Sequence, residues 1–171
     1  LETSLGFNER AVAIAEAAFG RDSPTVANRL NNYAVVLVGL ARFEDAEPLY
    51  REALVIFQRE YGPDDPRITP PLENLGNVLS GLERFEEAAE FFRRSLTIKR
   101  ATKGEDHPST AMSKMNLGVS LVRLGRLDEA EPLYADTLRV WSDKFGEDHP
   151  DVGIVETNLG DLAMARGKPE E

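Results

Sequence analysis

Apolar residues recur every three or four positions along most of the chain, which is the spacing of one buried stripe on an α-helix. Between Pro66 and Gly104 two such stripes follow each other, separated by the polar pair Glu83–Arg84. No stretch keeps the apolar–polar alternation that is typical of a strand. The pattern therefore predicts an all-α chain built from helical hairpins. In this segment the two stripes consist of Leu72, Leu75, Leu79 and Leu82, and of Phe85, Ala88, Phe91, Phe92, Leu96 and Ile98.

The hairpin pattern returns with a fixed period of 42 residues. A period of this size is typical of a solenoid, in which each unit buries its apolar face against its neighbours. The repeat predicts one array over residues 1–171, with about eight helices. The residues that mark its register are Pro24, Pro66, Pro108 and Pro150; Gly20, Gly62, Gly104 and Gly146; Asp22, Asp64, Asp106 and Asp148; and Asn32, Asn74, Asn116 and Asn158.

The register places three full repeats at residues 24–65, 66–107 and 108–149. Residues 1–23 match the second helix of a truncated repeat, and residues 150–171 match the first helix of another. Because terminal units of an array normally carry polar caps, we expect further repeats beyond both ends. Open ends of this kind also favour self-association, since one array can stack on another.

The helix ends carry capping residues that return with the period. Glycine follows the second helices, where a left-handed C-cap places no strain on a Cβ atom. Proline starts the next helix, at a position that needs no N–H donor, and a residue able to cap the helix precedes it. We therefore interpret two histidines before the prolines as caps rather than metal ligands. The glycines are Gly62, Gly104 and Gly146, and the caps are Ser23, Asp65, His107 and His149.

Composition excludes several classes of function. With 30 acidic and 20 basic residues, the chain has a formal charge of −10, which disfavours nucleic acid and anionic membranes as main partners. No apolar run is long enough to span a bilayer, and no signal peptide is visible. The absence of cysteine fits a reducing cytoplasm. No phosphate-binding loop, nucleophile elbow or zinc-binding motif is present, so we expect no enzyme activity, no cofactor and no metal.

Residues inside the hairpins resemble the tetratricopeptide repeat. The family's Leu-Gly pair is matched by Leu75-Gly76, Leu117-Gly118 and Leu159-Gly160. Its usual unit has about 34 residues, and the longer unit here, with its Gly-Glu-Asp-His-Pro strings, resembles the repeats of kinesin light chains. The small and aromatic residues of the family's second helix are matched by Ala46, Ala88 and Ala130, and by Tyr50, Phe92 and Tyr134.

The resemblance implies a right-handed superhelical solenoid of antiparallel helix hairpins, whose first helices line a concave wall. Protein or peptide segments are the ligands that such a wall implies. One face of each first helix, spaced by three and four residues, is therefore the expected peptide-binding groove. Its residues are Asn28, Asn31, Asn32, Val35, Glu73, Asn74, Asn77, Met112, Met115, Asn116, Val119, Arg123, Ile154, Thr157, Asn158 and Asp161, and Pro70 lies on the same face.

One asparagine per repeat forms a ladder on this face. A primary amide donates and accepts hydrogen bonds, so each asparagine can hold one peptide group of an extended ligand. Alternatively, each asparagine bonds the adjoining repeat and ties two helices together, which needs no ligand. Further amides on the same face favour the first interpretation. The ladder is Asn32, Asn74, Asn116 and Asn158, and the further amides are Asn28, Asn31 and Asn77.

The face lacks the set of lysines and arginines with which chaperone adaptors of this family hold a C-terminal carboxylate. Arg123 is an isolated candidate, so carboxylate clamping is not expected. Met112, Met115, Val119 and Ile154 instead favour an apolar groove towards the C-terminal half, because methionine adapts its shape to varied partners.

Three further features lie on the predicted second helices. Trp141 aligns with Phe57 and is expected to cover its hairpin as a partly exposed ring. Pro48 and Pro132 predict a late helix start or a slight kink. The second helix of the middle repeat is unusually basic, which is typical of a solvated face or of a surface for an acidic partner. Its basic residues are Arg93, Arg94, Lys99, Arg100 and Lys103.

We therefore predict a non-catalytic cytoplasmic scaffold whose groove binds a peptide segment of another protein. The alternative is a structural spacer or self-association module of a larger multidomain protein, with no peptide in the groove. Substitution of ladder asparagines separates the two, because a tie between repeats contributes to stability and a ligand contact does not.

Overall fold

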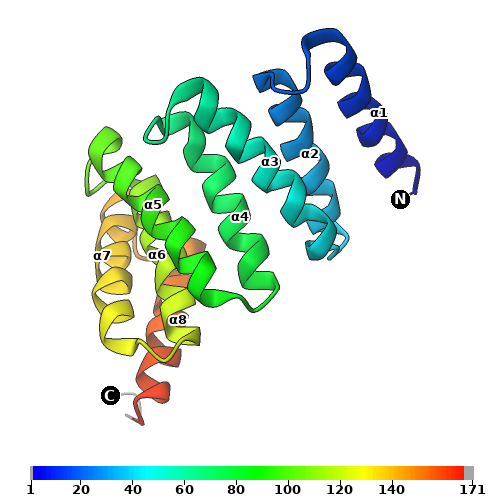
Figure 1. The fold of residues 1–171 in the computed structure, drawn as a ribbon. Coiled ribbons are helices and arrows are strands. Elements are labelled where there is room, and N and C mark those ends of the chain that lie inside the picture. The colour runs from blue at the N-terminus through cyan, green and yellow to red at the C-terminus, as the bar shows by residue number, and fades with distance from the viewer. Residues whose placement is uncertain (1, 168–171) are drawn as a thin grey trace. The chain divides into compact units, whose positions relative to one another are not determined.

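The structure is a computed structural model that describes residues 2–167. In this part of the chain it consists of eight α-helices and one 3₁₀ turn, η1, with no strand (Figure 1). The all-α fold of consecutive helical hairpins is therefore confirmed. The elements are α1 (Glu2–Phe19), α2 (Pro24–Gly39), α3 (Phe43–Tyr61), η1 (Pro66–Ile68), α4 (Thr69–Gly81), α5 (Phe85–Lys103), α6 (Pro108–Arg123), α7 (Leu127–Phe145) and α8 (Pro150–Ala165).

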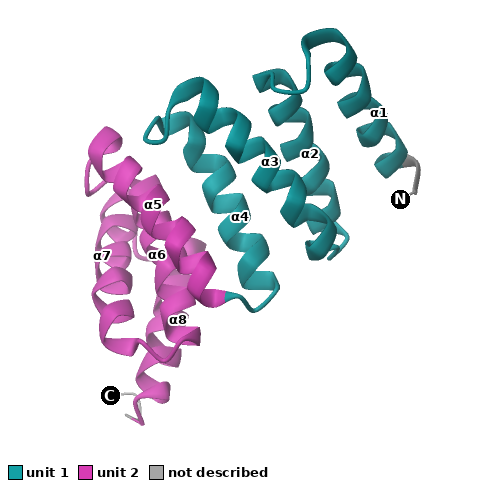
Figure 2. Ribbon diagram, viewed as in Figure 1, with its two compact units in different colours: residues 1–84 teal, residues 85–171 magenta. Residues whose placement is uncertain are grey.

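The chain divides into two compact units, unit 1 at residues 1–84 and unit 2 at residues 85–171 (Figure 2). The boundary falls in the loop between α4 and α5. In unit 1, α2 packs against α1 and α3, and α3 also packs against α4. In unit 2, α6 packs against α5, α7 and α8, and α7 packs against α8. The repeat boundaries and the right-handed superhelix stay predictions.

The residues that precede the repeat prolines cap their helices with side-chain acceptors, as the sequence predicts. His107 Nδ1 accepts a hydrogen bond from the backbone N–H of Ser109 at 3.1 Å, and His149 Nδ1 accepts one from Asp151 at 3.2 Å. An Nδ1 atom in this role carries no proton, so the proton of the neutral ring lies on Nε2. The other two caps are Ser23 and Asp65.

The helix expected to start at Pro66 differs from this pattern, because residues Pro66–Ile68 form a 3₁₀ turn and α4 starts at Thr69. The cause is the pair Pro70-Pro71, since neither residue has the N–H that a continuous α-helix would need at that point. Thr69 compensates by donating both its N–H and its Oγ1 to the Pro66 carbonyl.

Of the two alternatives predicted for the prolines of the second helices, the late start is wrong and the slight kink stays a prediction. Helix α3 starts at Phe43 and α7 at Leu127, each five residues before its internal proline. A proline in the second turn removes one hydrogen bond to the carbonyl four residues earlier. Those carbonyls belong to Glu44 and Asp128, both exposed residues, so water can replace the missing N–H.

Trp141 is buried rather than partly exposed, with 2% of its surface accessible. Its Nε1–H donates to the Pro108 carbonyl in the first turn of α6 at 3.2 Å. A buried indole needs such an acceptor, so the ring fixes the start of α6 against α7.

Gly118 on α6 lies against the ring of Tyr134 on α7, with no room for a side chain between them. A Cβ atom at Gly118 would lie 2.5 Å from Tyr134 Cε1, and Tyr134 is almost fully buried. Thr137, one turn further along α7, donates from Oγ1 to the Ala111 carbonyl of α6 at 3.0 Å. The two helices therefore approach closely because the Leu-Gly pair leaves no side chain between them.

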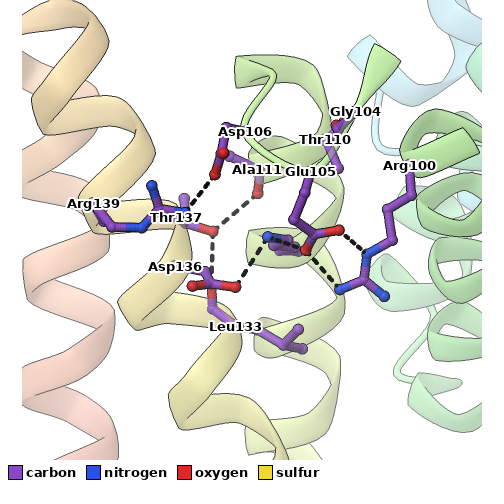
Figure 3. A network of polar contacts seen from close by, with 11 residues as sticks. Arg100, Gly104, Glu105, Asp106, Thr110, Ala111, Leu133, Asp136, Thr137 and Arg139 are labelled. Atoms are coloured by element: carbon purple, nitrogen blue, oxygen red, sulfur yellow. Dashed lines mark hydrogen bonds and ion pairs between the residues drawn. The ribbon is translucent and has the colours of Figure 1, made fainter. Parts of the chain in front are cut away.

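Lys114 on α6 is completely buried, with 0% of its side chain exposed. Its Nζ forms ion pairs with Glu105 Oε1 at 2.5 Å and Asp136 Oδ2 at 3.1 Å. Both carboxylates are about half exposed, so the network reaches from the interior to the surface (Figure 3). One repeat earlier in the sequence, the matching position holds the fully buried Leu72. The buried positive charge thus departs from the preceding repeat, and it joins α6, α7 and the loop before α6.

Because of this network, we expect the folded chain to lose stability at acid pH. The hydrogen bond from Lys114, and a second from Arg100, lower the pKa of Glu105 below its usual value of 4.5. Ionised Glu105 therefore stabilises the folded chain fully above the pKa that this carboxyl has in the unfolded chain. This stabilisation is lost as the pH falls through the lower pKa that Glu105 has in the folded chain. We expect the free energy of unfolding, measured with urea, to fall more between about pH 6 and about pH 3 in the natural chain than in Lys114→Leu. Equal losses in both proteins would contradict the assignment.

Candidate functional site

In unit 1, the expected groove residues come from the adjacent faces of α2 and α4. Asn28, Asn32 and Asn77 are exposed, whereas Asn31 and Asn74 are half-buried. The half-buried pair meets between the helices, where Asn74 Nδ2 donates to Asn31 Oδ1 at 3.1 Å. Two further residues are expected on this face. Val35 is exposed and Glu73 is half-buried.

A pocket of about 350 Å³ opens beside this pair. Asn28 and Asn31 of α2 form one wall, and Pro70 and Pro71 of α4 form another. Its volume falls at the lower end of the range of ligand pockets, about 300–1,000 Å³. The pocket also includes the aromatic residues Phe57 and Tyr61 from the end of α3, and Arg67 from η1.

The amides of the pocket wall retain hydrogen-bonding capacity. Asn28 Nδ2 donates to the Pro24 carbonyl at 2.9 Å, and Asn31 Oδ1 accepts from Asn74. Within residues 2–167, no hydrogen bond engages Asn28 Oδ1 or Asn31 Nδ2. The wall therefore presents one acceptor and one donor, which is the complement of a peptide group.

Arg67 lines the pocket, and an ion pair neutralises its positive charge. Its guanidinium carbon lies 3.7 Å from the centre of the Tyr61 ring, and Tyr61 in turn stacks on Phe57. The Arg67 Nε atom donates to Asp65 Oδ1 at 2.8 Å. This hydrogen bond lowers the pKa of Asp65 to about 2, so the pair stays ionised and carries no net charge at neutral pH. The pocket thus favours an uncharged apolar group beside a peptide bond.

Sequence reasoning missed the contribution of Tyr61 and Arg67. Tyr61 returns with the period as Phe19 and Phe145, so the repeat itself carried a signal for this position. Arg67 occurs once, and its signal was the departure from the repeat, since the next repeat holds Ser109 there.

In unit 2, the expected groove residues lie on α6 and on α8, which pack against each other. Met112, Val119 and Ile154 are 37%, 38% and 50% exposed, so apolar atoms reach the surface on both helices. The side chain of Arg123 lies over the ring of Phe85, 4.6 Å from its centre. Exposed residues of the same set are Thr157 and Asp161, and half-buried ones are Met115, Asn116 and Asn158.

The asparagine ladder is uniform in sequence but not in contacts. Asn74 binds Asn31, whereas the described part of the chain offers no hydrogen-bond partner to the side chains of Asn32, Asn116 and Asn158. The tie between repeats thus applies to one member, and the other three have free amides. The interpretation as a tie between repeats therefore does not cover the whole ladder, and ligand binding stays a prediction.

The described residues contain no group of three or more metal-binding side chains that could hold an ion. No helix in the described part of the chain is long and apolar enough to cross a bilayer.

Comparison with known proteins identifies the repeat. The tetratricopeptide repeat model matches residues 1–59, 30–101, 67–131 and 109–171. No curated protein matches the sequence.

Similar solved structures include kinesin-light-chain-like repeat proteins. A putative kinesin light chain with nearly identical TPR-like repeats from Podosopora anserina, in a point-variant form, superposes with a TM-score of 0.85 at 18% identity, over 97% of this chain and 78% of that one. BtubC (BKLC) from P. vanneervenii gives a TM-score of 0.76 at 27% identity, over 96% and 66%. The Sgt2 TPR domain from Aspergillus fumigatus gives 0.59 at 19% identity, over 85% of each chain.

Proposed function

Because the chain belongs to the tetratricopeptide repeat family, whose domains generally act as protein-interaction modules, we propose that it is a non-catalytic scaffold that binds an extended peptide segment of a partner. The ligand lies along the expected groove face of the first helices. The observation that carries this proposal is the unit 1 pocket, whose wall offers an unengaged acceptor on Asn28 and an unengaged donor on Asn31.

The chemistry of the pocket defines the peptide. Asn31 Nδ2 donates to a carbonyl of the ligand backbone, and Asn28 Oδ1 accepts an N–H. The side chain next to that peptide group enters the space between Pro70 and Tyr61. Because the Arg67–Asp65 pair neutralises its own charges, an uncharged apolar side chain fits best. Met112 and Ile154 give unit 2 a similar apolar character.

A second candidate, self-association or spacing of a larger chain, is favoured by the exposed apolar side of α1. Phe7 and Ile14 lie two turns apart on that helix and are 71% and 59% exposed. Exposed apolar stripes of this kind mark surfaces that bind protein. The cytoplasmic location expected from the composition stays a prediction.

The proposal is tested by selection of peptides on immobilised chain from a random peptide display library. Affinities of the selected peptides are then measured by fluorescence anisotropy for the natural chain and for Asn28→Ala/Asn31→Ala. We expect a loss of about tenfold or more, since two hydrogen bonds to the ligand disappear. Asn8→Ala, which removes an amide from α1 outside the face, is the matched control and is expected to leave affinity unchanged.

Two results favour the alternative. If selection enriches no peptide, or if the enriched peptides bind both variants equally, the groove proposal fails. A concentration-dependent mass in sedimentation equilibrium that disappears in Phe7→Ser/Ile14→Ser would then assign the chain to self-association.

Substitution of the ladder asparagines distinguishes a structural role from a ligand-binding role. Asn74→Ala leaves the half-buried Asn31 Oδ1 without its donor, so we expect a loss of about 1 kcal/mol in the free energy of unfolding. Asn116→Ala removes no hydrogen bond within the described chain, and we expect a change below about 0.5 kcal/mol. Urea titration of both variants measures the difference. Equal losses would show that Asn116 also ties repeats together.

A further inference from the structure

The proposed groove does not use Arg93, one of the basic residues of α5. Arg93, Leu96, Thr97 and Arg100 follow one another at intervals of three, one and three residues, so they share one side of α5. Two arginines seven residues apart are separated by about 10 Å along a helix axis. This side therefore combines apolar and positively charged groups in a single stripe.

The stripe borders a cleft of about 560 Å³ within unit 2. One wall is α5 and the other is the first part of α7, while Leu117 and Leu121 of α6 lie at its base. Leu121 is nine residues from Met112, so the two point to opposite sides of α6, about 180° apart. The cleft is thus a surface separate from the expected groove face of the same helix.

All but one of the charged side chains that line the cleft form an ion pair. Asp128 on α7 pairs with Arg166, which also pairs with Glu131, and Glu129 pairs with Arg126. On the α5 wall, Arg100 pairs with Glu105.

Within the described residues, the guanidinium of Arg93 makes no ion pair or hydrogen bond. Its longer-range field adds to the main effect of Arg126, which lowers the pKa of Glu129. In the described part of the chain, Arg93 is therefore the charged lining residue without a direct partner, and Leu96 lines the same cleft.

We propose that this cleft binds an amphipathic helix of a partner protein, with aliphatic residues on its inner face and a carboxylate on the flank that faces Arg93. A helix fits because the cleft lies between two helices that pack on a third, an arrangement into which another helix can insert its apolar stripe. Nucleic acid does not fit, since Arg93 is a single unpaired cation and a polyanion requires clustered lysines and arginines. The partner helix therefore carries isolated acidic residues rather than a long run of them.

A direct test uses a synthetic, fluorescein-labelled alanine-based helix of about 15 residues. It carries a leucine stripe flanked on one side by glutamates, and a second peptide has lysines in place of the glutamates. At low salt, we expect the natural chain to bind the glutamate peptide about tenfold more tightly than the lysine peptide. The charge reversal Arg93→Glu is expected to invert this preference.

The controls separate the cleft from other surfaces. Arg10→Glu reverses an exposed arginine of α1 that has no ion-pair or hydrogen-bond partner within the described chain, and it is expected to leave both affinities unchanged. Thr97→Trp fills the cleft without changing its charge and is expected to weaken both peptides. Circular dichroism of each variant checks that the helices remain.

The proposal is overturned if the glutamate peptide does not bind, or if Arg93→Glu leaves its affinity unchanged. It is also overturned if the natural chain dimerises and Arg93→Glu abolishes the dimer, because the cleft would then hold a second copy of this chain. Neither result would contradict the proposed groove, because the two surfaces are separate. Asn28→Ala/Asn31→Ala is accordingly expected to bind the helical peptide normally.

Discussion

Gly118→Val is expected to reduce the free energy of unfolding by about 3 kcal/mol. A Cβ atom at this position lies 2.5 Å from Cε1 of Tyr134 and 3.0 Å from Cδ1, well inside van der Waals contact. Tyr134 is 1% exposed, so its ring cannot move away without displacing α7. Overpacking of a filled core typically costs about 1–3 kcal/mol, and the two methyl groups of valine add to the clash. Urea titration measures the loss.

Gly153→Ala is the matched control in the same unit. No atom lies within 4 Å of a Cβ built at Gly153 in α8, so alanine adds helix propensity without a clash. We expect a gain of about 0.5–1 kcal/mol. If both substitutions had the same sign, the close approach of α6 and α7 at Gly118 would not be a determinant of the fold.

Removal of both carboxylates around Lys114, in Glu105→Ala/Asp136→Ala, is expected to cost about 3 kcal/mol. The side chain of Lys114 has no contact with solvent, and a buried charge without its partners typically costs about 3–5 kcal/mol. The lower end applies because truncation of two half-exposed carboxylates admits water to the ammonium group. Urea titration at neutral pH gives the measurement.

Lys114→Leu supplies the control for this prediction. Leucine occupies the matching position as Leu72, and replacement of a buried ion pair by a well-packed apolar group is often neutral or stabilising. We expect a change below about 1 kcal/mol. In the Lys114→Leu background, the two alanine substitutions should cost little, because the buried charge is gone. Equal costs in both backgrounds would show that the carboxylates act independently of Lys114.

The helices and their starts could be predicted from the sequence, because they depend on neighbouring residues that recur in each repeat. Leucine spacing defined the helices, and the caps Ser23, His107 and His149 marked where α2, α6 and α8 begin. These signals act within a few residues of one another, so one sequence suffices to read them. The 3₁₀ turn at Pro66 departs from the repeat because the local pair Pro70 and Pro71 lacks the N–H donors of a continuous helix.

Contacts between helices could not be predicted in the same way. The pairing of Asn74 with Asn31, and not of Asn116 with any described residue, depends on which side chain the neighbouring helix supplies. Arg67 in the unit 1 pocket and the buried Lys114 arise where one repeat departs from the others. Such departures are visible in the sequence, but their meaning depends on distances in three dimensions.

The two proposed surfaces differ in what they recognise. The unit 1 pocket offers amide groups and an uncharged apolar space, which suits a peptide in extended form. The unit 2 cleft offers aliphatic side chains beside the unpaired Arg93, which suits a helix. A scaffold with both could hold two segments at once, and binding through two sites raises overall affinity without new contacts.

Proton–nitrogen correlation NMR of the side-chain amides tests the central claim, peptide binding at the groove face, most directly. A peptide selected on the chain is titrated into the nitrogen-labelled protein, with the amide signals assigned by single substitutions. Binding at the pocket predicts that the signals of Asn28 and Asn31 shift with the same affinity as anisotropy reports, while that of Asn8 on α1 stays in place. If the peptide binds and the signals of Asn28 and Asn31 do not move, the groove face is not its site and the account is wrong.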